Sequence, residues 1–175
     1  GDCRREDGST GQMVGRLNES DTERGGTMAA KSLVKILFEL EAGWHGYETE
    51  TLWAEPVGGE RYRLRNSPFF AFGVSAEDIV FARSEDGVLR FKGVSIAGGH
   101  STYRIVLADV TRDDVERFLR PLAELGCTYE EGKALAVDVP PAANIYQVYS
   151  LLEAGEARGL WEFDEGNCRH PIEVD

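Results

Sequence analysis

Apolar and polar residues alternate along the chain between residues 33 and 94. A period of two places every second side chain on one face, which is typical of β-strands with one buried side. In the first such segment the apolar face consists of Val34, Ile36, Phe38 and Leu40. Further strands are predicted over 47–57, after the glycine pair at 58–59, and over 79–83 and 88–94. Short strands joined by tight turns predict a small β-barrel-like half over residues 31–100.

Two tight turns fix the register that we expect in this half. A two-residue turn at Gly58-Gly59 places Trp53 opposite Leu64. A turn at Asp86-Gly87 places Arg83 directly across from Arg90. Facing like charges are unfavourable by up to about 1 kcal/mol. We therefore expect an anionic group beside Arg83 and Arg90, supplied either by the protein or by a ligand.

Helical spacing first appears after Thr111, which is followed by acidic residues that suit the first turn of a helix. After residue 100 the first predicted elements are a strand over 103–107, a helix over 112–125, and strands over 127–130 and 134–139. A second helix is predicted to begin at Pro140-Pro141 and to fray between Gly155 and Gly159. A last strand is predicted over 160–164. This β-α-β-β-α-β order is typical of the ferredoxin-like arrangement. The predicted fold class is therefore α+β, with an N-terminal small β-barrel-like half followed by a C-terminal ferredoxin-like half over residues 101–175.

The start of the chain differs from the rest in composition. Residues 1–27 are polar and offer almost nothing to bury. Such a segment cannot offset the entropy lost on ordering, so we expect residues 1–30 to form a disordered arm or extension. Met28 lies just before the first predicted strand, and we interpret it as a candidate natural start of the protein.

The charge of the chain is negative and unevenly placed. The 19 Lys and Arg residues and the 31 Asp and Glu residues give a formal net charge of -12. Residues 101–175 carry 7 basic and 15 acidic side chains, and therefore a net charge of -8. An acidic surface repels phosphate backbones, so we expect no nucleic-acid partner. The charge suits a basic protein partner, and it equally serves simple solubility.

Composition also bears on location and on metals. No run of about 18 apolar residues exists, so we expect no membrane span, and no leader pattern opens the chain. The three cysteines are far apart and odd in number, which favours a reducing cytoplasm over a disulfide framework. Cys168 and His170 lack enough further ligands for a structural zinc site. We therefore expect no metal and no cofactor.

The best polar constellation lies where the two predicted halves meet, directly after Gly98-Gly99. His100, Thr102 and Arg104 share one face of a strand, because alternate residues point the same way. An imidazole, a hydroxyl and a guanidinium in a row suit the binding of a carboxylate or a phosphate. The alternative is structural, with the hydroxyls capping strand ends and His100 bonded to backbone.

Other candidates lie in the first half. Trp44 and His45 occupy a predicted turn, where they either line the edge of a pocket or cover one end of the barrel. Arg83 and Arg90 are candidate ligand-binding residues because of the expected anion beside them. They also belong to a basic sheet face that would be neutralised by nearby glutamates if it is a solvated surface.

Several segments resemble a bacterial family known as a domain of unknown function, DUF4265. They are Leu52-Trp53-Ala54-x-Pro56-Val57, Asn66-Ser67-Pro68-Phe69-Phe70, Gly99-His100-Ser101-Thr102-x-Arg104, Ala136-Val137-Asp138-Val139-Pro140 and Leu152-x-x-Gly155-Glu156-x-x-Gly159-x-Trp161-Glu162. The resemblance runs from about Val34 to His170. It implies a bacterial, cytoplasmic protein, and it brings no activity, cofactor or catalytic residue.

Three functional hypotheses remain open at this stage. The first is a non-enzymatic binding or regulatory module with its site between the halves, because the chain has no phosphate loop, dinucleotide fingerprint or nucleophile elbow. The second is an inhibitor or immunity-type acidic protein that caps a basic partner. The third is a small enzyme that uses His100 as acid or base. The expected partners are a protein or a small anionic ligand, with a homodimer through the ferredoxin-like sheet as a further possibility.

Overall fold

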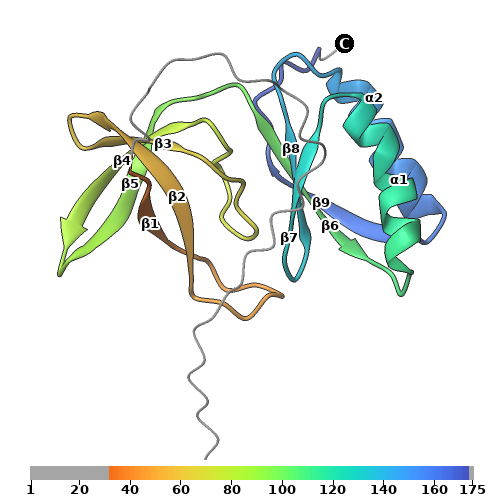
Figure 1. The fold of residues 1–175 in the computed structure, drawn as a ribbon, viewed down its shortest axis with the longest axis horizontal. Coiled ribbons are helices and arrows are strands. Elements are labelled where there is room, and N and C mark those ends of the chain that lie inside the picture. Colours follow the sequence, from red (N-terminus) through yellow and green to blue (C-terminus); the bar gives the residue numbers. More distant parts are fainter. Residues whose placement is uncertain (1–31, 174–175) are drawn as a thin grey trace, which may run out of the picture.

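The computed structural model describes residues 32–173. It is a mixed α+β structure of two mostly antiparallel sheets and two helices, and the helices lie on one side of the second sheet (Figure 1). The predicted arm over residues 1–30 and the candidate start at Met28 lie outside the described residues. Neither helix in the described part of the chain is long and apolar enough to cross a membrane.

The first sheet contains five strands, in the order β1-β2-β3-β4-β5. Their bounds are β1 Val34–Glu39, β2 Thr49–Gly58, β3 Arg61–Leu64, β4 Ile79–Glu85 and β5 Val88–Ile96. Neighbours in this order are antiparallel, and β5 returns to β1 through one parallel register pair, Leu37 with Arg90. The core of this sheet contains Ile36, Phe38, Leu52, Ala54, Leu64 and Val80, each at most 2% exposed. The alternation that predicted β1 is therefore confirmed by its burial.

The two predicted hairpin registers had different outcomes. Arg83 does pair with Arg90, as the turn at Asp86-Gly87 predicts. The register predicted for β2 and β3 is wrong, since Leu64 lies opposite Ala54 instead of Trp53. The turn is formed by Gly59 and Glu60, which both have positive φ, and the pairing shifts between Pro56 and Gly58. This bulge moves the register by one residue, so that Leu64 joins the buried face.

The second sheet contains four antiparallel strands, in the order β7-β8-β6-β9. The elements of this half are β6 Ser101–Leu107, α1 Arg112–Glu124, β7 Thr128–Glu131, β8 Leu135–Val139, α2 Ile145–Ala157 and β9 Trp161–Asn167. This chain order and strand order are consistent with the ferredoxin-like prediction. The two helices bury one face of the sheet in an apolar core that includes Tyr103, Ile105, Val137, Val148 and Leu152.

The helix boundaries follow from their caps. Thr111 caps α1 as predicted, since its hydroxyl accepts the N–H of Asp114 at 3.2 Å. The predicted start of α2 at Pro140-Pro141 is wrong. Asn144 is the cap, because its side chain accepts the N–H groups of Tyr146 and Gln147.

The predicted fraying of α2 from Gly155 is also wrong. Gly155 is buried inside the helix, and a Cβ placed there would lie 1.9 Å from the ring of Trp161. The glycine is needed so that this indole can pack directly against the helix backbone. The helix therefore continues to Ala157.

Candidate functional site

The face of the second sheet that the helices leave uncovered contacts the segment 66–78, which connects β3 to β4. We call this contact the seam. Thr102 of β6 is completely buried in it, and its hydroxyl donates to Oγ of Ser75 at 2.8 Å. Asn167 of β9 donates to the same oxygen at 2.9 Å. The seam is therefore joined by side-chain hydrogen bonds between the two halves.

Arg104 lies two residues further along the same face and is only 2% exposed. Its Nε donates to Oδ1 of Asp164 and its Nη1 donates to the carbonyl of Phe69, both at 3.1 Å. The ring of Phe72 covers the guanidinium, with the guanidinium carbon 4.1 Å from the ring centroid. Nη2 is buried without a hydrogen-bond partner. Arg104 thus fixes the connecting segment to the sheet, and its charge faces protein groups.

His100 is placed beside Asp138, which pairs with Thr102 across β6 and β8. Its Nδ1 lies 3.0 and 2.9 Å from the two carboxylate oxygens of Asp138. Both side chains are about one-sixth exposed, at 18% and 16%. Burial raises the pKa of Asp138, while the hydrogen bond and charge of His100 oppose that rise. The polar row predicted from the sequence is therefore brought together on one face.

Ser101 points to the opposite face of β6 and makes a separate buried contact. Its hydroxyl lies 2.6 Å from Nδ1 of His170, whose Nε2 is 3.0 Å from the carbonyl of Pro140. Because a carbonyl only accepts, Nε2 carries the proton and Nδ1 accepts from Ser101. The serine oxygen also accepts the N–H of Arg169 at 2.9 Å. The pair of Ser101 and His170 therefore holds residues 169–170 against β6. Because Ser101 is completely buried, the pair is not accessible to a substrate.

The backbone of residues 69–71 is held by one carboxylate. Glu50 of β2 accepts the N–H groups of Phe69, Phe70 and Ala71, the last two at 2.9 Å. Successive N–H groups that converge on an anion form a concave site of fixed geometry. The aromatic side chains of this segment are therefore displayed from a rigid backbone.

Phe70 is the centre of an aromatic cluster that we define as Trp44, His45, Tyr47 and Phe70. Their ring centroids lie 5.9, 4.6 and 5.0 Å from that of Phe70. Nζ of Lys133, in the turn between β7 and β8, lies 4.6 Å from the centroid of Tyr47. The connection between β1 and β2 and the turn between β7 and β8 lie near each other at the lower edge of the fold (Figure 1). The cluster thus belongs to the first half, and Lys133 of the second half contacts it beside the seam.

The cluster is open to solvent. Trp44 is 60% exposed and Tyr47 is 38% exposed. The sequence placed Trp44 and His45 in a turn, either at a pocket edge or over a barrel end. The structure confirms the turn and brings both rings against Phe70 of the connecting segment. A ligand-binding role for Trp44 and His45 stays a prediction.

Arg83 and Arg90 lie away from the seam, on the hairpin of β4 and β5. Glu60 lies 3.8 Å from Arg83, while Glu39 and Glu85 lie 3.3 and 3.6 Å from Arg90. The anionic group expected beside the facing arginines is therefore supplied by the protein. A ligand-binding role for these two residues stays a prediction.

The described residues offer neither a metal cluster nor a reactive thiol at Cys127. Among residues 32–173, no group of three or more His, Cys, Asp or Glu side chains is arranged to hold a metal ion. Cys127 and Cys168 are free cysteines. Burial raises the pKa of the Cys127 thiol to about 12, so it is a protonated, inert group at neutral pH.

Sequence reasoning missed several residues that build the seam. Asp138 carried a usable signal, because it is a carboxylate within the otherwise apolar run from Leu135 to Val139. Glu50 and Ser75 carried none, because their partners lie 19 or more residues away in the chain. Only the folded connecting segment reveals what they bind.

Comparison with known proteins adds a family and a fold. The model of a family described as domain of unknown function (DUF4265) matches residues 50–163. A solved structure of a hypothetical protein from Neisseria gonorrhoeae is similar with a TM-score of 0.68 and 21% identity, over 81% of this chain and 98% of that chain. At that identity the likeness concerns the fold alone. No curated protein matches the chain.

Proposed function

We propose that this chain, which belongs to the DUF4265 family of unknown function, is a non-enzymatic binding protein that docks a protein partner on its aromatic cluster. The proposal places the site between the two halves, at the open end of the seam. It also treats the halves as a small barrel and a ferredoxin-like unit over residues 31–100 and 101–175, held in one orientation by the seam.

The observation that carries the proposal is exposed aromatic surface on a locked backbone. Exposed aromatic groups that gather in one place mark interaction sites more often than scattered apolar residues do. Trp44 exposes 60% of its surface, and its contact Phe70 is fixed through the carboxylate of Glu50. A surface that is ordered before binding loses less entropy when a partner docks.

The chemistry around the cluster favours a basic partner. Glu41 and Glu48 are exposed in the same turn as Trp44, within a chain of net charge -12. Aromatic faces attract cations, and Lys133 already lies over Tyr47. A small anionic ligand is less well served, because Arg104 is 2% exposed and lies under Phe72. We therefore infer a partner that presents arginine or lysine side chains, which is the kind of partner that this chain would cap as an inhibitor or immunity-type protein.

Affinity capture from the native cells tests this proposal. The tagged wild-type chain is compared with a Trp44→Ala, Tyr47→Ala double variant and with Phe81→Ala, a matched control at a residue that is 43% exposed on β4. The expected result is a protein retained by the wild type and the control, lost from the double variant, and released by high salt. Retention of the same proteins by all three chains would remove the basis of the proposal.

A second candidate function is an enzyme that uses His100. The observation in its favour is that Asp138 engages Nδ1, which orients the ring and leaves Nε2 as the free nitrogen. No nucleophile among the described residues lies within hydrogen-bond distance of this ring, so the arrangement serves an acid or base only. A His100→Gln variant that keeps the cellular phenotype of the wild type would eliminate it, whereas loss of the phenotype with a folded protein would support it.

A homodimer through the second sheet has limited room. Segment 66–78 covers Thr102 and Arg104 on the face without helices, and Val106 is the apolar side chain of β6 that stays 39% exposed. Light scattering of the purified chain over a concentration series would detect such a dimer. The cytoplasmic location of the protein likewise stays a prediction.

A further inference from the structure

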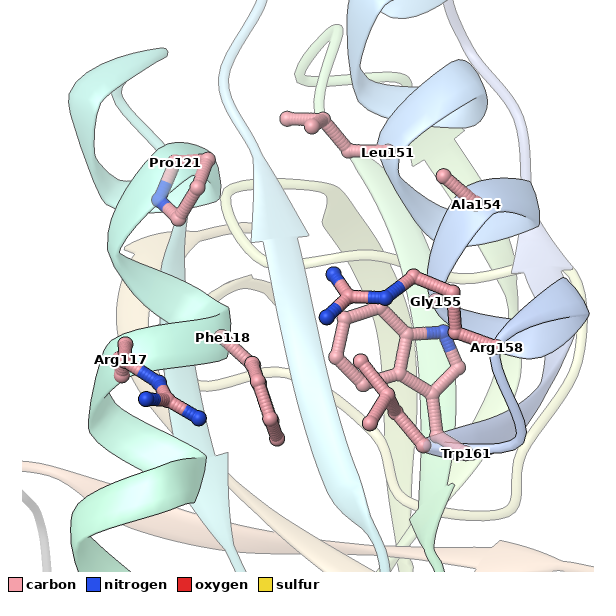
Figure 2. Close-up of a pocket in the computed structure, with 9 residues that line it drawn as sticks. Arg117, Phe118, Pro121, Leu151, Ala154, Gly155, Arg158 and Trp161 are labelled. Carbon is pink, nitrogen blue, oxygen red and sulfur yellow. The ribbon is translucent and has the colours of Figure 1, made fainter.

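A groove lies between α1 and α2, on the opposite side of the second sheet from the seam. Its volume is about 400 Å³, and its apolar lining includes Phe118, Pro121, Leu151, Leu160 and Trp161. Pockets that hold small molecules span about 300–1,000 Å³ and are mostly apolar with a few polar groups. Figure 2 shows the side chains of α1 and α2 facing each other across this groove. Its size and lining are therefore those of a small-molecule site.

The floor of the groove is preformed. Trp161 is 5% exposed, and its indole N–H donates to the carbonyl of Leu152 at 2.9 Å. The ring lies against the backbone of α2 at Gly155, where any side chain would collide with it. The indole is thus locked in position and lines the groove with the small part of its surface that stays exposed.

Two arginines that line the groove each place a guanidinium group against the ring of Phe118. Arg117 comes from α1 and Arg158 from the end of α2, and their guanidinium carbons lie 5.0 and 5.7 Å from the centroid of the same Phe118 ring. In Figure 2 the guanidinium of Arg158 extends across the indole of Trp161 toward α1. Asp114 pairs with Arg117 at 3.0 Å, while no carboxylate of residues 32–173 pairs with Arg158.

This concentration of positive charge is unusual in its surroundings, because residues 101–175 carry a net charge of -8. Asp114 already neutralises Arg117, so Arg158 is the cation of this groove that has no carboxylate partner among residues 32–173, and an anionic group beside it would be stabilised. The apolar lining below them suits a hydrocarbon chain. We propose that the groove binds a medium-chain carboxylate, with its hydrocarbon on Trp161 and its carboxylate at Arg158. This site is independent of the partner surface at the seam.

Calorimetric titration of the full chain with decanoate tests the proposal. We expect saturable binding at one site, and binding about fifteenfold weaker for octanoate, which has two buried methylenes fewer than decanoate. Decanol and decyltrimethylammonium have the same chain with no charge or the opposite charge, and both should bind more weakly than decanoate. Absence of saturable decanoate binding, or equal binding of the cationic amphiphile, would overturn the proposal.

Variants locate the site. Arg158→Gln should weaken decanoate binding by at least about tenfold, since it removes the charged hydrogen-bond donor of the carboxylate. Arg120→Gln is the matched control, because Arg120 is exposed on α1 and does not line the groove. Ala154→Phe should block the groove by filling it. Unchanged binding by Arg158→Gln would contradict the assignment of the carboxylate.

The indole N–H signals provide a readout that does not depend on how well each variant folds. The chain has three tryptophans, of which Trp161 lies in the groove and Trp44 in the aromatic cluster. Decanoate should shift the Trp161 signal of the wild-type protein in a nitrogen–proton NMR spectrum and leave the Trp44 signal in place. A shift of Trp44 alone would place the amphiphile at the seam and overturn the groove assignment.

Discussion

The two faces of the second sheet are built in opposite ways. On the helix side, Tyr103 and Ile105 of β6 pack into hydrocarbon with Leu152 of α2. On the seam side, Thr102 and Arg104 of the same strand are equally buried, but their contacts are hydrogen bonds to Ser75 and Phe69. Alternate residues of one strand thus contribute to an apolar core on one face and to a hydrogen-bonded contact on the other.

This difference separates stability from orientation. Apolar burial is non-directional and scales with area, so the helix side of this sheet contributes more to the free energy of folding than the seam side does. Hydrogen bonds contribute a net of only about 0.5–1.5 kcal/mol each, but they require specific partners at specific angles. The seam therefore selects one relative placement of the two halves, and that placement brings Trp44 and Phe70 together with Lys133.

The largest expected effect is on the helix side. Leu152→Ala removes a completely buried side chain from the apolar core. We expect the free energy of unfolding to fall by about 2–5 kcal/mol, from lost transfer energy and from the cavity left behind. Urea denaturation followed by circular dichroism measures this loss. A loss below about 1 kcal/mol would mean that this core does not dominate the stability of the chain.

A smaller loss is expected at the seam. Arg104→Met leaves the carbonyl of Phe69 without its donor, while Asp164 is 46% exposed and can be solvated. We expect a loss of about 1–3 kcal/mol in the free energy of unfolding. Arg65→Met is the matched control, because its ion pair with Glu77 is exposed and contributes about 0–1 kcal/mol. Equal losses in the two variants would show that Arg104 does not join the halves.

The smallest effect depends on pH. Burial raises the pKa of Glu130 above its ordinary value of 4.5, opposed by hydrogen bonds from Ser67 and Asn66. The folded state then holds the proton more tightly than the unfolded state, so stability falls as the pH rises through this range. Glu130→Gln removes the ionisation but keeps an acceptor for Ser67.

We therefore expect Glu130→Gln to be more stable than the wild type at pH 7, with the difference vanishing below about pH 4. Urea midpoints at the two pH values measure this. Glu162→Gln is the control, since Glu162 is exposed on β9. A variant that is less stable than the wild type at neutral pH would show that the carboxylate is needed in its charged form.

Short-range patterns predicted much of the fold. Alternation predicted β1, and the turn at Asp86-Gly87 predicted the pairing of Arg83 with Arg90. The register between β2 and β3 was not predictable in the same way, because a bulge near Gly58 depends on backbone conformation. Gly155 appeared to be a helix breaker, since only the folded structure shows Trp161 pressed against it.

The candidate site was predictable only in part. The shared face of His100, Thr102 and Arg104 follows from strand geometry alone. Strand geometry does not predict what covers that face. The cover is a segment about 30 residues earlier in the chain, and this segment is fixed by Glu50. The aromatic cluster could not be assembled from the sequence either, since Trp44 and Phe70 lie 26 residues apart in two different connecting segments of the first half.

The central claim is that the aromatic cluster at the seam is the surface on which a partner docks. Photo-crosslinking in the native cells tests it most directly, with a benzophenone amino acid replacing Trp44 in one chain and Phe81 in another. The account predicts a discrete crosslinked protein from position 44 that is absent from position 81. Identical crosslinking patterns from both positions, or none from position 44, would contradict it.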